Sequence, residues 1–167
     1  MLRRANVPDL IAGRRLGCTA LTEPGAESDF AAIETRATRC DSGWLIHGAK
    51  AWITNASDAD VVILYAQTDP GSGSRGIACF VIDGRRDGFV REPAYALGGQ
   101  HTIGAGGFRL EGYRARDEEL LQLAGKAFKA ALISSKEPCA VNSRGVAALT
   151  GWARSQPLGA ELSAPAA

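Results

Sequence analysis

Two strongly apolar runs lie close together in the middle of the chain and set the strictest limit on its fold. Val61 to Ala66 and Ile77 to Ile82 alternate only weakly between apolar and polar residues, and a polar turn rich in Gly and Ser separates them. This pattern is typical of central β-strands that are covered on both faces. The rest of the chain must supply the covering elements, and it offers few.

Shorter β-like runs flank this pair, separated by turn residues at short intervals. The turns have suitable chemistry, with Pro-Gly at 24–25, Asp-Ser-Gly at 41–43 and Asp-Gly at 83–84. Many short strands of this kind predict a mainly β fold, either a sandwich or a barrel. The predicted strands span 18–22, 32–40, 44–53, 61–67, 76–83, 89–95 and 106–114.

The β region has a clear beginning. Residues 1–15 form a short segment of mixed polar and apolar residues that Pro8 should break, so this segment cannot form a domain by itself. Residues 16–116 then form the predicted β-barrel domain.

The character of the sequence changes again after Arg116. Residues 117–153 begin with a loop, and a helix is predicted over 125–134 that Pro138 should end or kink. A weaker helix is predicted near the end of this segment, over 142–153. Residues 154–167 are rich in Ala, Pro and Ser and are expected to be a disordered tail.

Charge and cysteine content argue against several classes of protein. A formal net charge of +1 gives no reason to expect nucleic acid or an anionic membrane as a partner. The four cysteines form no Cys-x-x-Cys pair and only His47 and His101 accompany them, so reduced thiols are favoured over a zinc site. No signal-like apolar run follows Met1, and no apolar stretch approaches the ~20 residues of a membrane span. A cytoplasmic protein is therefore expected.

The most informative segment, residues 21–29, reads Leu-Thr-Glu-Pro-Gly-Ala-Glu-Ser-Asp. A strand ends at Thr22, and the turn that follows exposes backbone N–H groups beside the hydroxyls of Thr22 and Ser28. Such a rim can hydrogen-bond a polar heterocycle or a phosphate. The alternative is an ordinary turn in which Ser28 or Asp29 caps a helix. Spacing alone favours the ordinary turn.

A second segment, residues 48–56, reads Gly-Ala-Lys-Ala-Trp-Ile-Thr-Asn-Ala. Trp52 and Thr54 alternate on one predicted strand, so their side chains should point to the same face. A large aromatic ring beside a hydroxyl can cover a flat ring system and offer it a hydrogen bond. The alternative places Trp52 in the core and Thr54 at the strand end. The residues alone do not separate these two interpretations.

Together these segments resemble the paired signature of the acyl-CoA dehydrogenases. The resemblance covers about residues 8–135 and includes two long motifs in the right order at the right separation. Further matches support it. They are Thr35-x-Ala37, Gly43-Trp44-x-Ile46-x-Gly48, Ala59-Asp60, Asp69-Pro70, Arg75-Gly76-Ile77, the region from Leu97-Gly98 to Arg109, and Gly125-x-Ala127-Phe128-Lys129.

The resemblance implies a fold and a cofactor. Members of this family have an N-terminal helical domain, a central β-barrel and a C-terminal four-helix domain, usually in a tetramer. They bind FAD between the barrel and the C-terminal helices. The matching positions imply a set of FAD-binding residues, which are Ala20, Leu21, Thr22, Ser28, Trp52, Ile53 and Thr54.

The resemblance also implies what these residues do. The strand that ends at Thr22 would hold the pyrimidine side of the flavin through backbone groups and the threonine hydroxyl. Trp52 would lie along the isoalloxazine ring with Thr54 near its reactive nitrogen. Ser28 would sit where the cofactor meets the acyl-CoA substrate, so it is also a substrate-binding residue. The implied reaction is α,β-dehydrogenation of an acyl-CoA thioester, with electrons leaving through an electron-transfer flavoprotein and the complete protein being a homo-oligomer.

Three departures from the family's pattern bear on activity. The N-terminal helical domain is missing except for a remnant, Val7 to Leu10, and the C-terminal domain ends after one or two helices. Glu27 stands where the family has glycine between Ala26 and Ser28. A carboxylate there adds bulk and a charge that would repel phosphate.

No residue is nominated as the catalytic base. Some family members carry a glutamate on the first C-terminal helix, and counting from Phe128 that position falls at Pro138. Glu137 lies one residue early, which turns it roughly 100° away. We therefore expect a fragment of an FAD-dependent acyl-CoA dehydrogenase that is inactive alone. The alternative is a non-catalytic β-module that binds a partner chain or keeps a remnant of the flavin site.

Overall fold

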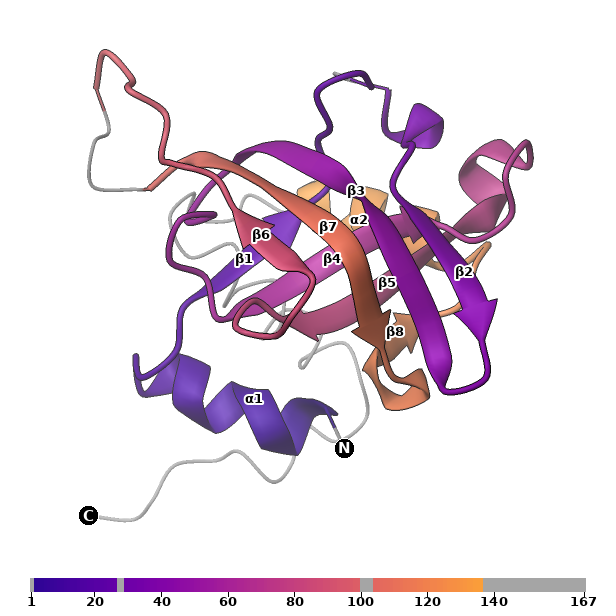
Figure 1. The fold of residues 1–167 in the computed structure, drawn as a ribbon, viewed down its shortest axis with the longest axis horizontal. Helices are drawn as coiled ribbons and strands as arrows, with labels where there is room; N and C mark the ends of the chain where they lie inside the picture. The colour runs from indigo at the N-terminus through magenta and orange to yellow at the C-terminus, as the bar shows by residue number, and fades with distance from the viewer. Residues whose placement is uncertain (1, 27–28, 100–103, 137–167) are drawn as a thin grey trace.

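The seven predicted strands and the helix predicted over 125–134 occur in the predicted order along the chain. The structure is a computed structural model that describes residues 2–26, 29–99 and 104–136 (Figure 1). Its strands are β1 (Gly17–Ala20), β2 (Arg36–Cys40), β3 (Gly43–Ile53), β4 (Val61–Gln67), β5 (Ile77–Asp83), β6 (Phe89–Arg91), β7 (Gly106–Ala115) and β8 (Leu120–Gln122). Its α-helices are α1 (Leu2–Ile11) and α2 (Ala127–Lys136), and 3₁₀ turns span Phe30–Ala32, Gly73–Gly76 and Asp117–Glu119.

The described strands form one strongly curved sheet in the order β6-β7-β3-β2-β4-β5-β8, with β1 running parallel to β4 at its side. Asp41 and Ser42 join β2 to β3 in a tight hairpin, as the turn residues predict. Gly43 has a φ of 132°, and a Cβ built on it would lie 2.3 Å from the Ala115 carbonyl oxygen on β7. Glycine is therefore required where β3 leaves the hairpin and meets β7.

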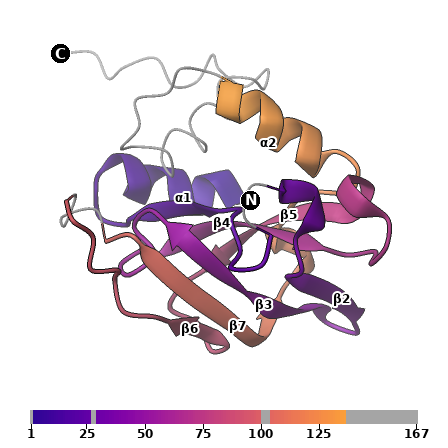
Figure 2. The same cartoon turned by 90° about the horizontal axis from the view of Figure 1, so that it is seen from above.

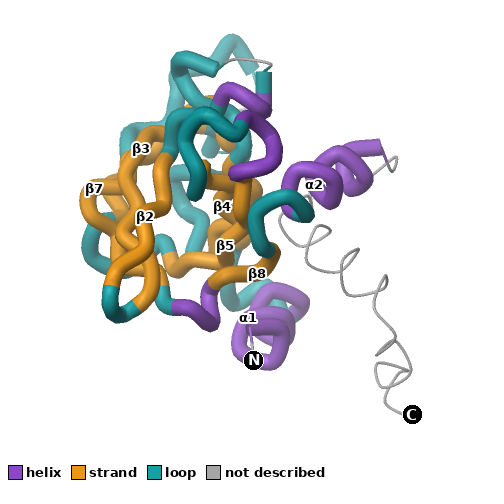
Figure 3. The backbone as a smooth tube through the Cα atoms, turned by 90° about the vertical axis from the view of Figure 1, so that its right-hand side faces the viewer, coloured by secondary structure: helices purple, strands orange, loops and turns teal. Residues whose placement is uncertain are grey.

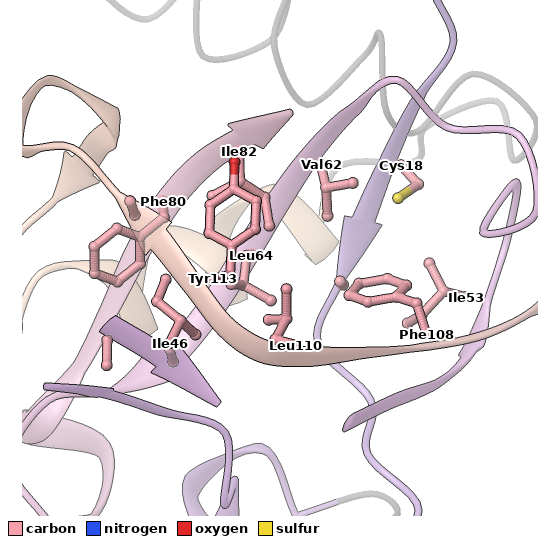
Figure 4. Close-up of a cluster of buried hydrophobic side chains, with 14 of the residues drawn as sticks. Cys18, Ile46, Ile53, Val62, Leu64, Phe80, Ile82, Phe108, Leu110 and Tyr113 are labelled. Carbon is pink, nitrogen blue, oxygen red and sulfur yellow. The ribbon is translucent and has the colours of Figure 1, made fainter. Parts of the chain in front are cut away.

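One hydrophobic core fills the space between the two halves of this curved sheet. Inward side chains of β3 and β7 meet those of β4 and β5, and β1 contributes at one end (Figure 4). The labelled members are Cys18, Ile46, Ile53, Val62, Leu64, Phe80, Ile82, Phe108, Leu110 and Tyr113. The predicted mainly β, barrel-like fold is confirmed.

A second cluster covers the outer face of β4 and β5. Val61, Ile63 and Tyr65 belong to this cluster together with Leu10 of α1 and Ala127 of α2. Figures 2 and 3 show both helices beyond β4 and β5, on the side away from β3 and β7. Every residue of β4 is buried, so the prediction that this strand is covered on both faces is confirmed.

The prediction that Pro8 breaks the first segment is wrong, because α1 runs through it. Leu10 is buried against the sheet, and the Arg15 guanidinium donates to the Asn6 side-chain oxygen at 2.7 Å and to Asp83 at 3.1 Å. These contacts outweigh the hydrogen bond that the proline cannot make.

The strand predicted from residue 32 begins later, at Arg36. Phe30–Ala32 forms a 3₁₀ turn instead, and the Asp29 carboxylate caps it by accepting from the Ala31 N–H at 3.0 Å. The alternative interpretation of residues 21–29 predicted that Ser28 or Asp29 caps a helix. The capping at Asp29 confirms it.

Two further boundaries differ from prediction. β6 ends at Arg91 rather than 95, just before Pro93, which has no N–H to donate to a ladder. The segment after Arg116 was expected to be a loop, but it contains the short strand β8, which pairs with Cys79 and Phe80 of β5.

Several predictions lie outside the described residues. They concern the helix over 142–153, the tail over 154–167, and Glu27, Ser28, His101, Glu137, Pro138 and Cys139. The boundaries drawn at residues 15 and 116 stay predictions. Neither described α-helix is both long enough and apolar enough to span a membrane.

Candidate functional site

The ends of β1 and β3 meet at one edge of the curved sheet. The Ala51 N–H donates to the Thr22 carbonyl oxygen at 3.1 Å, and the Lys50 ammonium donates to the Leu21 carbonyl oxygen at 3.1 Å. Ala20 is fully buried where β1 pairs with β4, whereas Leu21 and Thr22 are half-buried. The structure therefore brings together two segments that lie about thirty residues apart in sequence. We call residues 20–22 and 52–54 the rim.

Trp52 projects from the rim into solvent. The residue is 65% exposed, which excludes the alternative that places it in the core. Its ring meets Tyr95 edge-on, with centroids 4.8 Å apart and an interplanar angle of 65°. The Tyr95 N–H donates to the Ala105 carbonyl oxygen at 2.8 Å, so the loop behind the indole is itself held.

The strand is irregular at this point. Trp52 has a φ of 58°, and the register between β3 and β7 shifts between Lys50 and Ile53. A bulge of this kind redirects a side chain, and a bulky residue at positive φ is strained. Trp52 and Thr54 are both exposed while Ile53 between them is 3% exposed. Simple alternation predicted that the two side chains share a face, but it predicted neither their exposure nor the bulge.

Sequence reasoning missed a role for two charged residues that lie directly beside the rim. The Lys50 ammonium lies 2.7 Å from the Glu23 carboxylate, with the two side chains 0% and 4% exposed. The same carboxylate accepts the Glu34 N–H at 2.6 Å and the Thr35 N–H at 3.1 Å. Lysine in a strand is usually solvated, and simple alternation would place Lys50 on the same face as the exposed Trp52, so no local pattern indicated its burial.

Burial and charge act against each other in this pair. Burial lowers the pKa of the Lys50 ammonium to about 8, although the charge of Glu23 pulls it upward. Burial pulls the pKa of the Glu23 carboxyl upward. The charge of Lys50 and the hydrogen bonds from Lys50, Thr35 and Glu34 outweigh that effect and bring it below its usual value. Both groups are therefore charged at pH 7.

The rim is an open platform. One groove runs past Pro24, Gly25 and His47, and another past Ile33 and Pro70, but neither is lined by Trp52 or Thr54. A flat ring laid on the rim would need a second surface to cover its other face.

The thiols of Cys18 and Cys79 are shielded from solvent. The described cysteines are free, with Cys18 and Cys79 buried and Cys40 half-buried. Burial raises the pKa of both Cys18 and Cys79 to about 12, so these thiols are unreactive. Among the described residues, no group of three or more His, Cys, Asp or Glu side chains could hold a metal ion.

The middle-domain family of the acyl-CoA dehydrogenases matches residues 18–113. The chain belongs to the acyl-CoA dehydrogenase family. Members of this family are FAD-dependent flavoproteins. The matched region contains both segments of the rim together with most of β1, all of β2 to β6 and most of β7.

Individual relatives agree. A glutaryl-CoA dehydrogenase from Desulfococcus multivorans is 36% identical over 124 residues, which are 74% of this chain and 32% of that protein. The structure of a glutaryl-coenzyme A dehydrogenase glutaryl-CoA complex is 36% identical with a TM-score of 0.75, covering 80% of this chain and 34% of that one. Butyryl-CoA dehydrogenase from Megasphaera elsdenii is 31% identical with a TM-score of 0.75, covering 88% and 38%. This chain thus spans about a third of the length of these relatives.

Proposed function

We propose that this chain is the flavin-facing middle domain of an FAD-dependent acyl-CoA dehydrogenase and that the rim holds the isoalloxazine ring. The hydrogen bond between the Ala51 N–H and the Thr22 carbonyl oxygen carries the proposal. Through this bond, a hydroxyl residue and a solvent-facing indole share one edge of the fold. Neither segment alone has both features.

The residues of the rim suit a flavin. An isoalloxazine ring has flat faces and an edge of hydrogen-bonding nitrogen and oxygen atoms. The exposed Trp52 indole, supported from the side by Tyr95, offers a flat apolar surface. Thr22 and Thr54 offer hydroxyls that can donate or accept, and Ala20 and Leu21 add backbone groups. Ile53 holds the platform from beneath because it is buried in the core.

Bound FAD would supply the two-electron acceptor for α,β-dehydrogenation of an acyl-CoA thioester. The rim residues would orient the ring, and Ser28 is proposed to lie where the ring meets the substrate. We also propose that Glu23 is not a base in this reaction. Its carboxylate is occupied by Lys50 and by two backbone N–H groups.

We further propose that the chain alone does not turn over substrate, because a correctly placed base contributes about 10²–10⁴-fold to such a rate. In a complete protein, the partners would be an acyl-CoA thioester, an electron-transfer flavoprotein and other copies of the same subunit. The free thiols suit a reducing compartment such as the cytoplasm.

Titration with FAD tests the proposal. Saturable quenching of tryptophan fluorescence is expected, and Trp52→Phe should remove most of the quenched signal and weaken binding about fivefold. The matched control is Trp44→Phe at the other end of the same strand, which should leave both the affinity and the Trp52 signal in place. The absence of any saturable change at high FAD would refute a flavin site in this chain.

An activity assay tests the second part. Acyl-CoA thioesters of several chain lengths, with FAD and an artificial electron acceptor, should give no turnover. Any turnover would show that a base is present. Saturable binding to separately prepared helical domains of a family member, without FAD binding, would instead favour a non-catalytic module that docks on a partner chain.

A further inference from the structure

The buried pair of Lys50 and Glu23 lies between the two segments of the rim. Lys50 is two residues before Trp52 on β3, and Glu23 directly follows Thr22. Their charged groups are 2.7 Å apart and almost completely shielded from solvent. A single ion pair therefore ties the strand that carries the indole to the segment that carries the hydroxyl.

The pair also fixes individual backbone groups. The Lys50 ammonium donates to the Leu21 carbonyl oxygen, and the N–H of the next residue, Ala51, donates to the Thr22 carbonyl oxygen. Two consecutive residues of β3 thus hold two consecutive carbonyls of the rim. A carbonyl held in this way fixes the peptide plane and so the direction of the neighbouring N–H.

The carboxylate extends the constraint to a third segment. Glu23 accepts the N–H groups of Glu34 and Thr35, which lie directly before β2. Every strong bond of the pair therefore ends on backbone or on the other member. Buried ion pairs are often no more stabilising than apolar residues of similar volume. Apolar residues could not, however, form these directional hydrogen bonds, so the bonds are what distinguishes this pair.

We propose that Lys50 is a positioning residue for the flavin site: its ammonium sets the Leu21–Thr22 backbone in the place where it receives the polar edge of the ring. Glu23 supplies the counter-charge that lets this ammonium stay buried. Its carboxylate also holds the segment after Thr22 against the Glu34 and Thr35 N–H groups. This inference rests on the proposed function of the rim. It adds a role for two residues that do not touch the ring.

The test compares two charge-neutral double variants. Lys50→Met/Glu23→Gln removes the rim pair without leaving a lone buried charge, and Arg86→Met/Glu119→Gln does the same to an ion pair elsewhere in the fold. Each is measured for cooperative thermal unfolding, for FAD affinity and for hydrogen exchange of the Ala51 amide. The rim variant should unfold cooperatively yet bind FAD about tenfold more weakly and exchange the Ala51 amide about tenfold faster, as expected for loss of a hydrogen bond to a charged group. The control variant should keep the affinity and the Ala51 protection of the unsubstituted chain.

Stability and affinity respond differently under the two possible roles. If the pair only stabilises the fold, any variant that still unfolds cooperatively should bind FAD as tightly as the unsubstituted chain. A folded rim variant with unsubstituted affinity and unsubstituted Ala51 protection would overturn the proposal. If the unsubstituted chain binds no FAD, the proposed function fails. The Ala51 exchange rate then still decides whether Lys50 positions the backbone.

A measurement on the unsubstituted chain covers the case in which the rim variant does not fold. With the side-chain nitrogens of lysine and tryptophan labelled with ¹⁵N, the Lys50 ammonium should give a slowly exchanging signal that shifts when FAD is added, together with the Trp52 indole signal. A Trp52 signal that moves while the Lys50 signal does not would overturn the positioning role. FAD that moves neither signal would overturn the proposed function and the inference that depends on it.

Discussion

The two ends of the β3–β7 ladder are built differently. At one end, where Trp44 pairs with Ala115, Trp44 is half-buried and packs edge-on against Phe80 at 5.6 Å. Close to this end, the Arg86 guanidinium donates to Glu119 at 2.7 Å and to the Arg114 carbonyl oxygen at 2.6 Å. We call this the closing end, because its charged groups are paired and its aromatic ring is packed against the core.

The other end, where Ile53 pairs with Gly106, is the rim. Its tryptophan is exposed and has a positive φ, and the ion pair of Lys50 and Glu23 directly beside it is buried. Strain and buried charge both cost stability, and they persist only where the surrounding structure enforces them. Both ends thus have a tryptophan and an ion pair. At the closing end the tryptophan packs against the core, and at the rim it is exposed to solvent. This difference supports placing the function at the rim.

The largest predicted difference between the ends comes from removing one cation. Lys50→Met leaves Glu23 buried without its partner, and should lower the free energy of unfolding by about 3–5 kcal/mol. Arg86→Met removes a guanidinium that is 31% exposed, and Glu119, whose side chain is 12% exposed, still accepts the Arg116 N–H at 2.7 Å. This variant should therefore cost less, about 1–2 kcal/mol. Urea denaturation measures both values. Equal losses of stability would mean that the burial of the Lys50–Glu23 pair does not distinguish it from the Arg86–Glu119 pair.

Truncating the two tryptophans should give the next largest difference. Trp44→Ala removes a ring packed on Phe80 and should cost about 2–3 kcal/mol, somewhat less than a fully buried ring. Trp52→Ala removes a ring that is mostly in solvent and should change stability by no more than about 0.5 kcal/mol. The same variant should lose FAD affinity, whereas Trp44→Ala should keep it as long as it is folded. A large loss of stability in Trp52→Ala would show that the indole belongs to the core.

The third difference appears in acid. The folded-state pKa of Glu23 lies below its ordinary value of 4.5, so the unfolded chain binds a proton more readily. The stabilisation from this shift is complete above pH 4.5 and is lost as the pH falls through the folded-state pKa. Lys50→Met/Glu23→Gln should therefore lose less stability between pH 5 and pH 3 than the unsubstituted chain. Arg86→Met is the control and should keep the acid sensitivity that Glu23 confers. Parallel curves for the double variant and the unsubstituted chain would contradict the assignment.

The sequence predicts the strands well where local pattern decides. β4 matches its predicted span and β5 differs by one residue, because both are continuous apolar runs ended by turn residues. α1 could not be predicted in the same way. Its formation through Pro8 depends on Leu10 and Arg15 reaching the sheet, which no local pattern records.

The rim was predictable only in part. Motif resemblance indicated Thr22, Trp52 and Thr54, and the structure adds the bond that brings their segments together. Burial of Lys50 depends on Glu23, which lies 27 residues earlier in the chain. Pairing over such a distance requires the fold to be known, so a lysine flanked by alanines gives no local sign of it.

Glycine substitution gives the smallest predicted difference, and it reverses in sign between the two ends. In an ordinary strand, glycine is less stable than alanine by about 0.5–1 kcal/mol because it loses more backbone entropy. Trp44→Gly should therefore be less stable than Trp44→Ala by about that amount.

At Trp52 the order should be inverted. Its φ of 58° is unfavourable for alanine but is adopted freely by glycine, so Trp52→Gly should be more stable than Trp52→Ala by about 0.5–1 kcal/mol. Urea denaturation of the four variants measures both pairs in the same strand. If glycine is the less stable residue at both positions, the backbone at Trp52 is not held at positive φ. The indole would then be presented by a regular strand, and the rim would differ from the closing end only in its buried charge.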